Sequence, residues 1–213
     1  MKNPFHLPLV TWTALALAGC AAKSPVSFQY SDANGFRFED SGELVLHANC
    51  NYKPPHRSPR CIALIDGREF GDFVLEVDAM QTGRDEPHRD LCFFFGVKDV
   101  ANYYYVHIAK AADPNAHNIF RVADKPRTNI AEKTTNGADW GNGEWHRIKI
   151  ERELESGAIR VYFDDMENPI MRAMDKVHGW GMIGFGSFDN TGRFRNFTVS
   201  ATGSRPTTKK IFK

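Results

Sequence analysis

Short runs in which apolar and polar residues alternate recur along most of the chain. The clearest spans residues 72–79. There Phe73 and Val77 point to one side and Glu76 to the other, with the two-residue period of a β-strand that has one covered face. Residues 91–97 are almost continuously apolar, which predicts a central strand covered on both faces.

The remaining strands are predicted from similar patterns and from the intervening turns, which are rich in Asn, Asp and Gly. They are expected at residues 102–109, 118–122, 146–151, 158–163, 181–186 and 194–200. Beyond the leader, the sequence has no clear helical period. Many strands at hairpin spacing predict an all-β domain, a sandwich or jelly roll.

The start of the chain has a different pattern. Lys2 precedes an apolar run over residues 7–17, which is too short to span a bilayer and is typical of a secretory signal. The sequence from Leu17 to Cys20 (Leu-Ala-Gly-Cys) resembles the bacterial lipobox. This resemblance implies that Cys20 is lipidated and becomes the mature N-terminus of an exported protein.

These patterns divide the chain into four parts. We expect a signal peptide over 1–19, the lipidated cysteine and a polar tether over 20–31, a β-sandwich domain over 32–202 and a polar, basic tail over 203–213. Several acyl chains on one cysteine, at about 0.8 kcal/mol per buried methylene, give durable anchoring. The lipid is thus the expected membrane attachment. Ala21 rather than Asp after the cysteine favours the outer membrane.

Composition fits one soluble domain on this anchor. The chain has 213 residues, of which 42% are hydrophobic and 25% charged, with a net charge of +1. This balance is ordinary for a globular protein and predicts no surface for nucleic acid or a polybasic membrane patch. The aromatic fraction of 12%, with 16 Phe, favours strands.

Cysteine use agrees with export. Cys50 and Cys61 bracket a proline-rich loop, which a disulfide would stabilise by roughly 2–3 kcal/mol. Cys92 lies among Leu and Phe, so a buried free thiol is expected. Zinc binding by these three cysteines is disfavoured, because there is no Cys-x-x-Cys pair.

Two segments carry a family resemblance. Residues 145–150 (Trp-His-Arg-Ile-Lys-Ile), followed by 157–165, resemble the hairpin of concanavalin A-like, laminin-G-like domains. Residues 179–187 and 194–199 resemble the penultimate and closing strands of those domains. The likeness is nearest to the bacterial 3-keto-disaccharide hydrolase-like domains. It implies a concanavalin A-like jelly-roll sandwich of two antiparallel sheets, whereas function has to be argued from the site.

The candidate binding residues begin on the segment Asn102 to Ala109. A period of two places Tyr103, Tyr105 and His107 on one face, and leaves Tyr104 and its alternate neighbours for the core. Tyrosine rings stack on the apolar face of a pyranose, while their hydroxyl tips bond its hydroxyls. The pattern therefore predicts a glycan-binding face open to solvent.

Further polar residues flank this face in the sequence. The complete predicted ligand-binding set is Asp90, Tyr103, Tyr105, His107, His117 and Arg127. Such residues also occur as amphipathic cover and as satisfied buried pairs, so a purely structural interpretation stays open. Whether the side chains converge in one groove decides between these interpretations.

Two other functions stay open. A polysaccharide lyase would use Tyr105 and His107 as acid and base, with Arg127 neutralising a uronate; a hydrolase is implied by the family resemblance. A laminarinase-type glycosidase is disfavoured, because Gln81 stands where the acid is required. A protein-interaction module is the other alternative, and a dry, uncharged sheet face without a groove would favour it.

Two further residue groups complete the predictions. Glu39 and Asp189 are candidates for a structural Ca²⁺ at the sheet edge, as in related jelly rolls, although such a site needs six or more oxygens. His146 alternates with Trp145 in a core hairpin, so we expect it to point inward and to be hydrogen-bonded.

Overall fold

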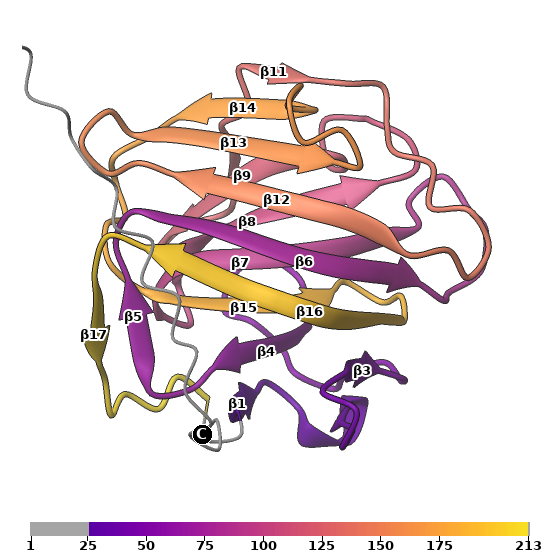
Figure 1. The fold of residues 1–213 in the computed structure, drawn as a ribbon, viewed down its shortest axis with the longest axis horizontal. Helices are drawn as coiled ribbons and strands as arrows, with labels where there is room; N and C mark the ends of the chain where they lie inside the picture. The colour runs from indigo at the N-terminus through magenta and orange to yellow at the C-terminus, as the bar shows by residue number, and fades with distance from the viewer. Residues whose placement is uncertain (1–25, 213) are drawn as a thin grey trace, which may run out of the picture.

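Two antiparallel sheets stacked face to face make up the molecule (Figure 1). The computed structural model describes residues 26–212. One sheet runs in the order β1-β4-β15-β7-β8-β9-β10 and the other in the order β11-β14-β13-β12-β6-β16-β3-β2. Within the described residues there is one turn of 3₁₀-helix, η1 (Ala33–Gly35), and no α-helix. No helix in this part of the chain is long and apolar enough to cross a membrane.

The seven-stranded sheet carries the candidate site. Its strands are β1 (Phe28–Tyr30), β4 (Cys61–Ile65), β7 (Asp90–Asp99), β8 (Asn102–Ala109), β9 (Asn118–Ala123), β10 (Thr128–Asn129) and β15 (Met182–Ser187). The long neighbours β7 and β8 lie in its middle and form a hairpin.

The eight-stranded sheet closes the sandwich on the other side. Its strands are β2 (Phe36–Phe38), β3 (Leu44–Leu46), β6 (Phe73–Gln81), β11 (Lys133–Thr134), β12 (His146–Arg152), β13 (Ala158–Phe163), β14 (Met171–Met174) and β16 (Gly192–Ala201). A separate pair, β5 (Arg68–Phe70) and β17 (Ser204–Pro206), runs along one end of the sandwich (Figure 1).

The core fills the space between the sheets. Phe93 on β7 makes edge-to-face contacts with Phe185 and Phe194, which come from opposite sheets. All three side chains are fully buried. Edge-to-face pairs of this kind add to the free energy gained by burying the rings. The predicted all-β sandwich is therefore confirmed, and so is each of the long strands predicted from alternation.

Both ends of the domain differ from the prediction. The expected tether includes β1, which pairs with β4. The expected solvated tail includes β17, and beyond it Ile211 is buried while Phe212 packs edge-on against Tyr52. Lys209 and Lys210 pair with acidic side chains rather than standing free. The tail is ordered because its apolar residues cover part of the seven-stranded sheet.

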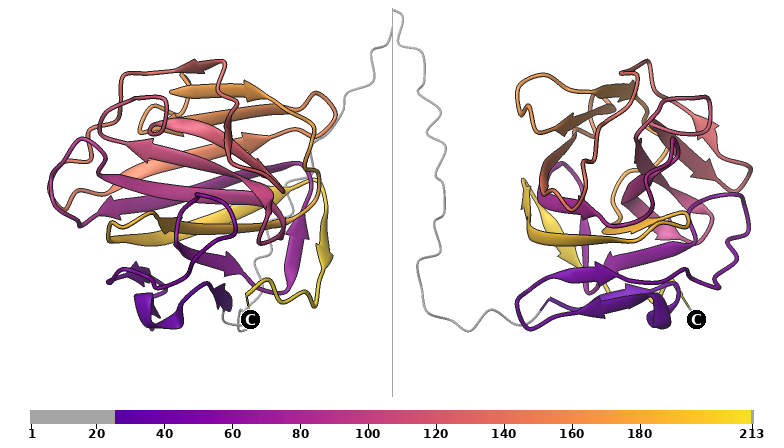
Figure 2. Two further views of the ribbon diagram at one scale, coloured as in Figure 1. Left: turned by 180° about the vertical axis from the view of Figure 1, so that it is seen from behind. Right: turned by 90° about the vertical axis from the view of Figure 1, so that its right-hand side faces the viewer.

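The cysteine predictions are confirmed within the described residues. Cys50 and Cys61 form a disulfide, and Cys92 is a buried free thiol. The disulfide closes the proline-rich loop over residues 51–60. In the view from the back (Figure 2, left), this loop lies on the viewer's side of the seven-stranded sheet. Cys20 lies outside the described residues, and its lipidation stays a prediction.

Candidate functional site

The strand β8 presents two different faces, as the period of two predicted. Tyr104, Val106 and Ile108 belong to the core between the sheets. Tyr103 and Tyr105 belong to a second apolar cluster, on the outer face of the seven-stranded sheet. His107 shares that outer face because it alternates with Val106 and Ile108 and contacts Asp90.

The outer face is covered rather than open, so the prediction of an exposed aromatic face was wrong. Tyr103 and Tyr105 are 3% and 0% exposed, and His107 is 5% exposed. Tyr103 donates a hydrogen bond to Ser58 Oγ at 2.7 Å, under the disulfide-closed loop. Ile211 packs in the same cluster. Burial raises the pKa of both tyrosines above the ordinary value.

One part of this face remains accessible. A pocket of about 270 Å³ opens over the ends of β7 and β8. We call it the Asp90–His107 pocket. It is lined by Arg57, Glu86, His88, Asp90, His107, Asn115, Ala116, Arg127, Phe188 and Asp189. Three predicted site residues thus converge: Asp90, His107 and Arg127.

Asp90 lies at the base of the pocket with no exposed surface. Its Oδ1 accepts hydrogen bonds from Ser187 Oγ at 2.8 Å and from Asn190 Nδ2 at 3.3 Å. Burial alone would raise the pKa of this carboxyl, but its interactions with His107, Cys92 and Ser187 hold the pKa below the ordinary value. A buried carboxylate is stable only with such a set of partners.

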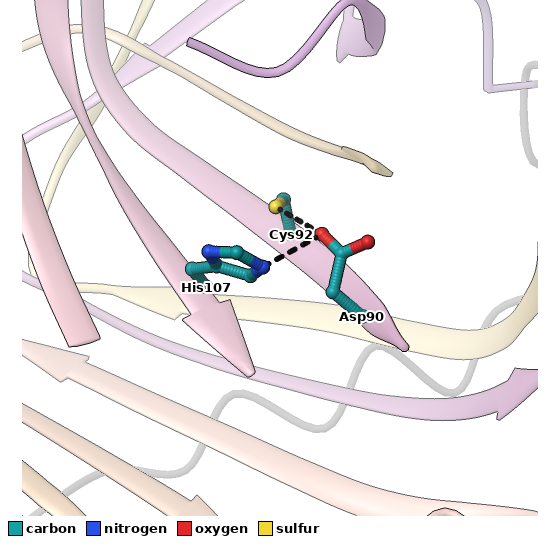
Figure 3. Close-up of side chains that lie close together, drawn as sticks. All are labelled: Asp90, Cys92 and His107. Atoms are coloured by element: carbon teal, nitrogen blue, oxygen red, sulfur yellow. Dashed lines mark hydrogen bonds and ion pairs between the residues drawn. The ribbon is translucent and has the colours of Figure 1, made fainter. Parts of the chain in front are cut away.

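The side chains of Asp90, Cys92 and His107 point toward one another (Figure 3). Cys92 Sγ donates to Asp90 Oδ2 at 3.1 Å, and His107 Nε2 lies 3.1 Å from the same oxygen. Burial and the neighbouring carboxylate raise the pKa of the Cys92 thiol well above its ordinary value. The three side chains meet because Cys92 pairs with His107 across β7 and β8.

Arg127 connects the pocket to the buried tyrosine. Its Nη1 donates to Tyr105 Oη at 2.7 Å, and its Nη2 donates to Asn115 Oδ1 at 3.1 Å. The guanidinium carbon lies 4.6 Å from the centre of the Phe120 ring and 5.1 Å from that of Phe188. These contacts hold the guanidinium against the two rings in the pocket lining, and a guanidinium has more N–H donors than these bonds use.

This arrangement argues against the proposed lyase chemistry at Tyr105. The hydroxyl group of Tyr105 lies beneath Arg127, and its pKa is raised by burial. The tyrosine does not line the pocket, whereas an acid or base has to reach the proton that it transfers.

His117 does not reach the pocket, so its predicted role in ligand binding is not supported. It is fully buried: its Nδ1 accepts from the Ala109 amide at 3.4 Å, and its Nε2 lies 2.9 Å from Thr135 Oγ1. Burial lowers the pKa of His117 from 6.5 to about 4. The ring is therefore a neutral structural residue at neutral pH.

This burial predicts a pH dependence of stability. The unfolded chain binds a proton at His117 below about pH 6.5 and the folded chain only near pH 4, so stability is lost as the pH falls through this window. The contribution is roughly 3 kcal/mol. Asparagine tolerates the backbone φ of 54° at this position. In His117→Asn, the fall in the free energy of unfolding between pH 6.5 and pH 4 should therefore be smaller by roughly 3 kcal/mol. Urea unfolding of the parent and the variant at several pH values measures this difference. If the free energy of unfolding depended on pH in the same way in both proteins, His117 would not be the neutral buried group described here.

The remaining sequence candidates are structural. Glu39 pairs with Arg37 and Arg193, and Asp189 lies 3.7 Å from Arg60. Among residues 26–212, those two acids form no cluster with metal-ligand spacing, so the calcium prediction has no support there.

The structural role predicted for His146 is confirmed, and Gln81 is also structural. His146 is buried, and its Nδ1 lies 2.8 Å from Asp164 Oδ2, as expected for a structural histidine. Gln81 is fully buried, and its Nε2 donates to Asn190 Oδ1 at 2.9 Å. This hydrogen bond from Gln81 anchors Asn190, which lies two residues after Phe188 in the same loop.

Several pocket residues were not predicted from the sequence. Arg57, Glu86, Asn115 and Phe188 come from four loops, where no period indicates which way a side chain points. A second hollow of about 380 Å³ shares Arg57, Phe188 and Asp189 with the pocket and extends to the loop that contains Tyr52. The shared residues place the two hollows side by side.

Comparison with known proteins identifies the fold. The structure superposes on the carbohydrate-binding module CBM66 from Bacillus subtilis with a TM-score of 0.60 and 20% identity, over 84% of this chain and 98% of that one. The winged bean acidic lectin, complexed with methyl-α-D-galactose, gives 0.55 and 13% over 87% and 94%. Lectin I-B4 from Griffonia simplicifolia gives 0.52 and 14% over 87% and 95%.

These likenesses confirm a lectin-like jelly-roll sandwich. No protein-family model and no curated protein sequence matches the chain. The resemblance to 3-keto-disaccharide hydrolase-like domains therefore stays a prediction. At 13–20% identity the neighbours show the fold alone.

Proposed function

We propose that this protein binds carbohydrate in the Asp90–His107 pocket. The main support for this proposal is that hydrogen-bond donors, hydrogen-bond acceptors and an aromatic ring line the same pocket. Arg57, Arg127 and His88 supply donors, and Glu86 and Asp189 supply acceptors. Each sugar hydroxyl both donates and accepts, so a pocket of mixed polarity suits a hydroxyl-rich ligand.

The aromatic part of the proposed site is Phe188. Its ring is partly buried, lines both hollows and is backed by the Arg127 guanidinium. A ring held in this way offers an apolar surface on which a pyranose stacks. Because the two hollows adjoin, a glycan chain longer than one residue fits the arrangement better than a free monosaccharide.

The fold and the surface support this function over a protein-interaction module. Carbohydrate-binding proteins are among the structural neighbours. The described large apolar side chains that are exposed are Val26, Met174 and Val177, which line neither hollow. Protein-docking surfaces usually have a contiguous apolar patch. The pocket is instead polar and concave.

The proposal also covers the cellular location of the protein. The lipobox-like sequence ending at Cys20 supports export and attachment to the outer membrane through lipid alone. If so, Cys20→Ala moves the protein from the membrane fraction to the soluble fraction. Retention of the variant on membranes would contradict the anchor and leave glycan binding untouched.

Glycan binding is tested by screening the full-length, detergent-solubilised protein on an array of neutral and acidic envelope and plant polysaccharides. We expect selective binding, with oligosaccharides of the bound type giving saturable heat by calorimetry and no new reducing ends or unsaturated products. Absence of binding across the array would contradict the proposal. Product formation would show that the pocket is catalytic.

A further inference from the structure

The Asp90–Cys92–His107 triad has the composition and spacing of a metal site. It joins a carboxylate, a thiol and an imidazole, and one ligand atom from each lies within 4.8 Å of the others. Asp90 Oδ2 is 3.1 Å from both Cys92 Sγ and His107 Nε2. Ligand atoms around a tetrahedral zinc ion lie roughly 3.3–3.7 Å apart, given bonds of about 2.0–2.3 Å. Small side-chain movements would make that spacing.

The imidazole provides a second, independent observation. His107 Nδ1 lies 3.2 Å from the carbonyl oxygen of Asn115, which can only accept, so Nδ1 carries a proton. Nε2 is the other ring nitrogen. It is buried, faces Asp90 and makes no aligned hydrogen bond despite the 3.1 Å contact. A buried ring nitrogen that faces a carboxylate without an aligned hydrogen bond is a position that a cation between the two groups would stabilise.

We infer that Asp90, Cys92 and His107 bind a transition-metal ion of the Zn²⁺ class. Thiolate and imidazole ligands favour such ions, whereas Ca²⁺ and Mg²⁺ prefer oxygen ligands alone. The site differs from the edge calcium site expected at Glu39 and Asp189.

Neighbouring groups orient two of the three proposed ligands, Asp90 and His107. Ser187 Oγ and Asn190 Nδ2 donate to Oδ1 of Asp90, which leaves Oδ2 for the ion. The Asn115 carbonyl fixes the ring of His107. Bonds of this kind orient the ligands in known metal sites. When the ion binds, Cys92 gives up its hydrogen bond to Asp90, releases its proton to solvent and binds as the thiolate.

The fourth position of such an ion faces the pocket. Asp90 and His107 both line the Asp90–His107 pocket, while Cys92 lies beneath them in the apolar cluster. Three protein ligands with an open side are the pattern of zinc sites that bind an exchangeable molecule. The ion would therefore contact solvent or a ligand in the pocket.

The test uses Co²⁺ and Zn²⁺ with the full-length chain carrying Cys20→Ser. Cys92 is then its one free thiol, because Cys50 and Cys61 are joined. We expect one Co²⁺ per chain, tetrahedral d–d bands and a thiolate-to-cobalt charge-transfer band. Zn²⁺ at a hundredfold excess over Kd should raise Tm by about 5–10 °C.

Variants locate the ion. Cys92→Ser and His107→Gln should each lose the charge-transfer band and most of the Tm increase, whereas His47→Gln, at an exposed histidine outside the triad, should keep both. Absence of Co²⁺ binding, or binding without the thiolate band in the parent chain, would overturn the inference even if a variant failed to fold. No sugar is present, so the outcome is independent of glycan binding.

Discussion

Replacing Asp90 with alanine is expected to lower the free energy of unfolding by about 3–5 kcal/mol. The change leaves Ser187, Asn190 and Cys92, which are all buried, without the acceptor that they share. Unpaired buried polar groups are costly because they lose water without gaining a partner. Urea unfolding in the presence of a chelator measures the effect without metal.

The matched control for this change is Asp85→Ala. Asp85 is an exposed acid that pairs with Lys110 at 2.6 Å, and exposed pairs contribute at most about 1 kcal/mol. Asp85→Ala should therefore leave the urea midpoint nearly unchanged. If Asp90→Ala were equally mild, the carboxylate would not organise the base of the pocket.

Arg127→Ala should weaken glycan binding about 100-fold, or about 2.7 kcal/mol. The arginine supplies pocket donors and backs the Phe188 ring, so its loss removes a polar contact and loosens the stacking surface. Stability should fall by about 1–3 kcal/mol, since Tyr105 loses its partner. Calorimetry with the selected oligosaccharide, well below Tm, separates the two effects.

A second arginine provides the comparison. Arg147 lies on β12 of the opposite sheet and pairs with Glu76 at 2.9 Å. Arg147→Ala removes the same charge from the molecule without touching the pocket. It should bind glycan like the parent protein; an equal loss of affinity in both variants would point to a general effect of charge rather than to the pocket.

The long strands could be predicted from the sequence because their pattern is local. Alternation located β6, β8 and β12 and assigned Tyr104 and Tyr105 to opposite faces of one sheet. The two-residue strands β10 and β11 were missed, since they exist through pairing with β9 and β14 rather than through their own sequence.

The exposure of the outer face could not be predicted in the same way. Whether Tyr103 is open depends on Ser58 and Ile211, which are far from it in the sequence. A period of two tells which face a side chain shares, not what folds over that face. The pocket residues Asn115 and Phe188 were missed for a related reason, because loops have no period.

The meeting of Asp90, Cys92 and His107 could not be predicted from the sequence either. Asp90 and Cys92 two residues apart on one strand were visible in the sequence, and so was His107. Their meeting depends on the register that places Cys92 opposite His107. One-residue slippage would move His107 to the other face, so the site is a consequence of sheet register.

A crystal structure of the protein with a bound oligosaccharide would show where the glycan lies. We expect sugar density in the Asp90–His107 pocket, with hydroxyl groups bonded to Arg127 and a ring stacked on Phe188. Density for an ordered glycan elsewhere on the sandwich, with this pocket holding only solvent, would contradict it.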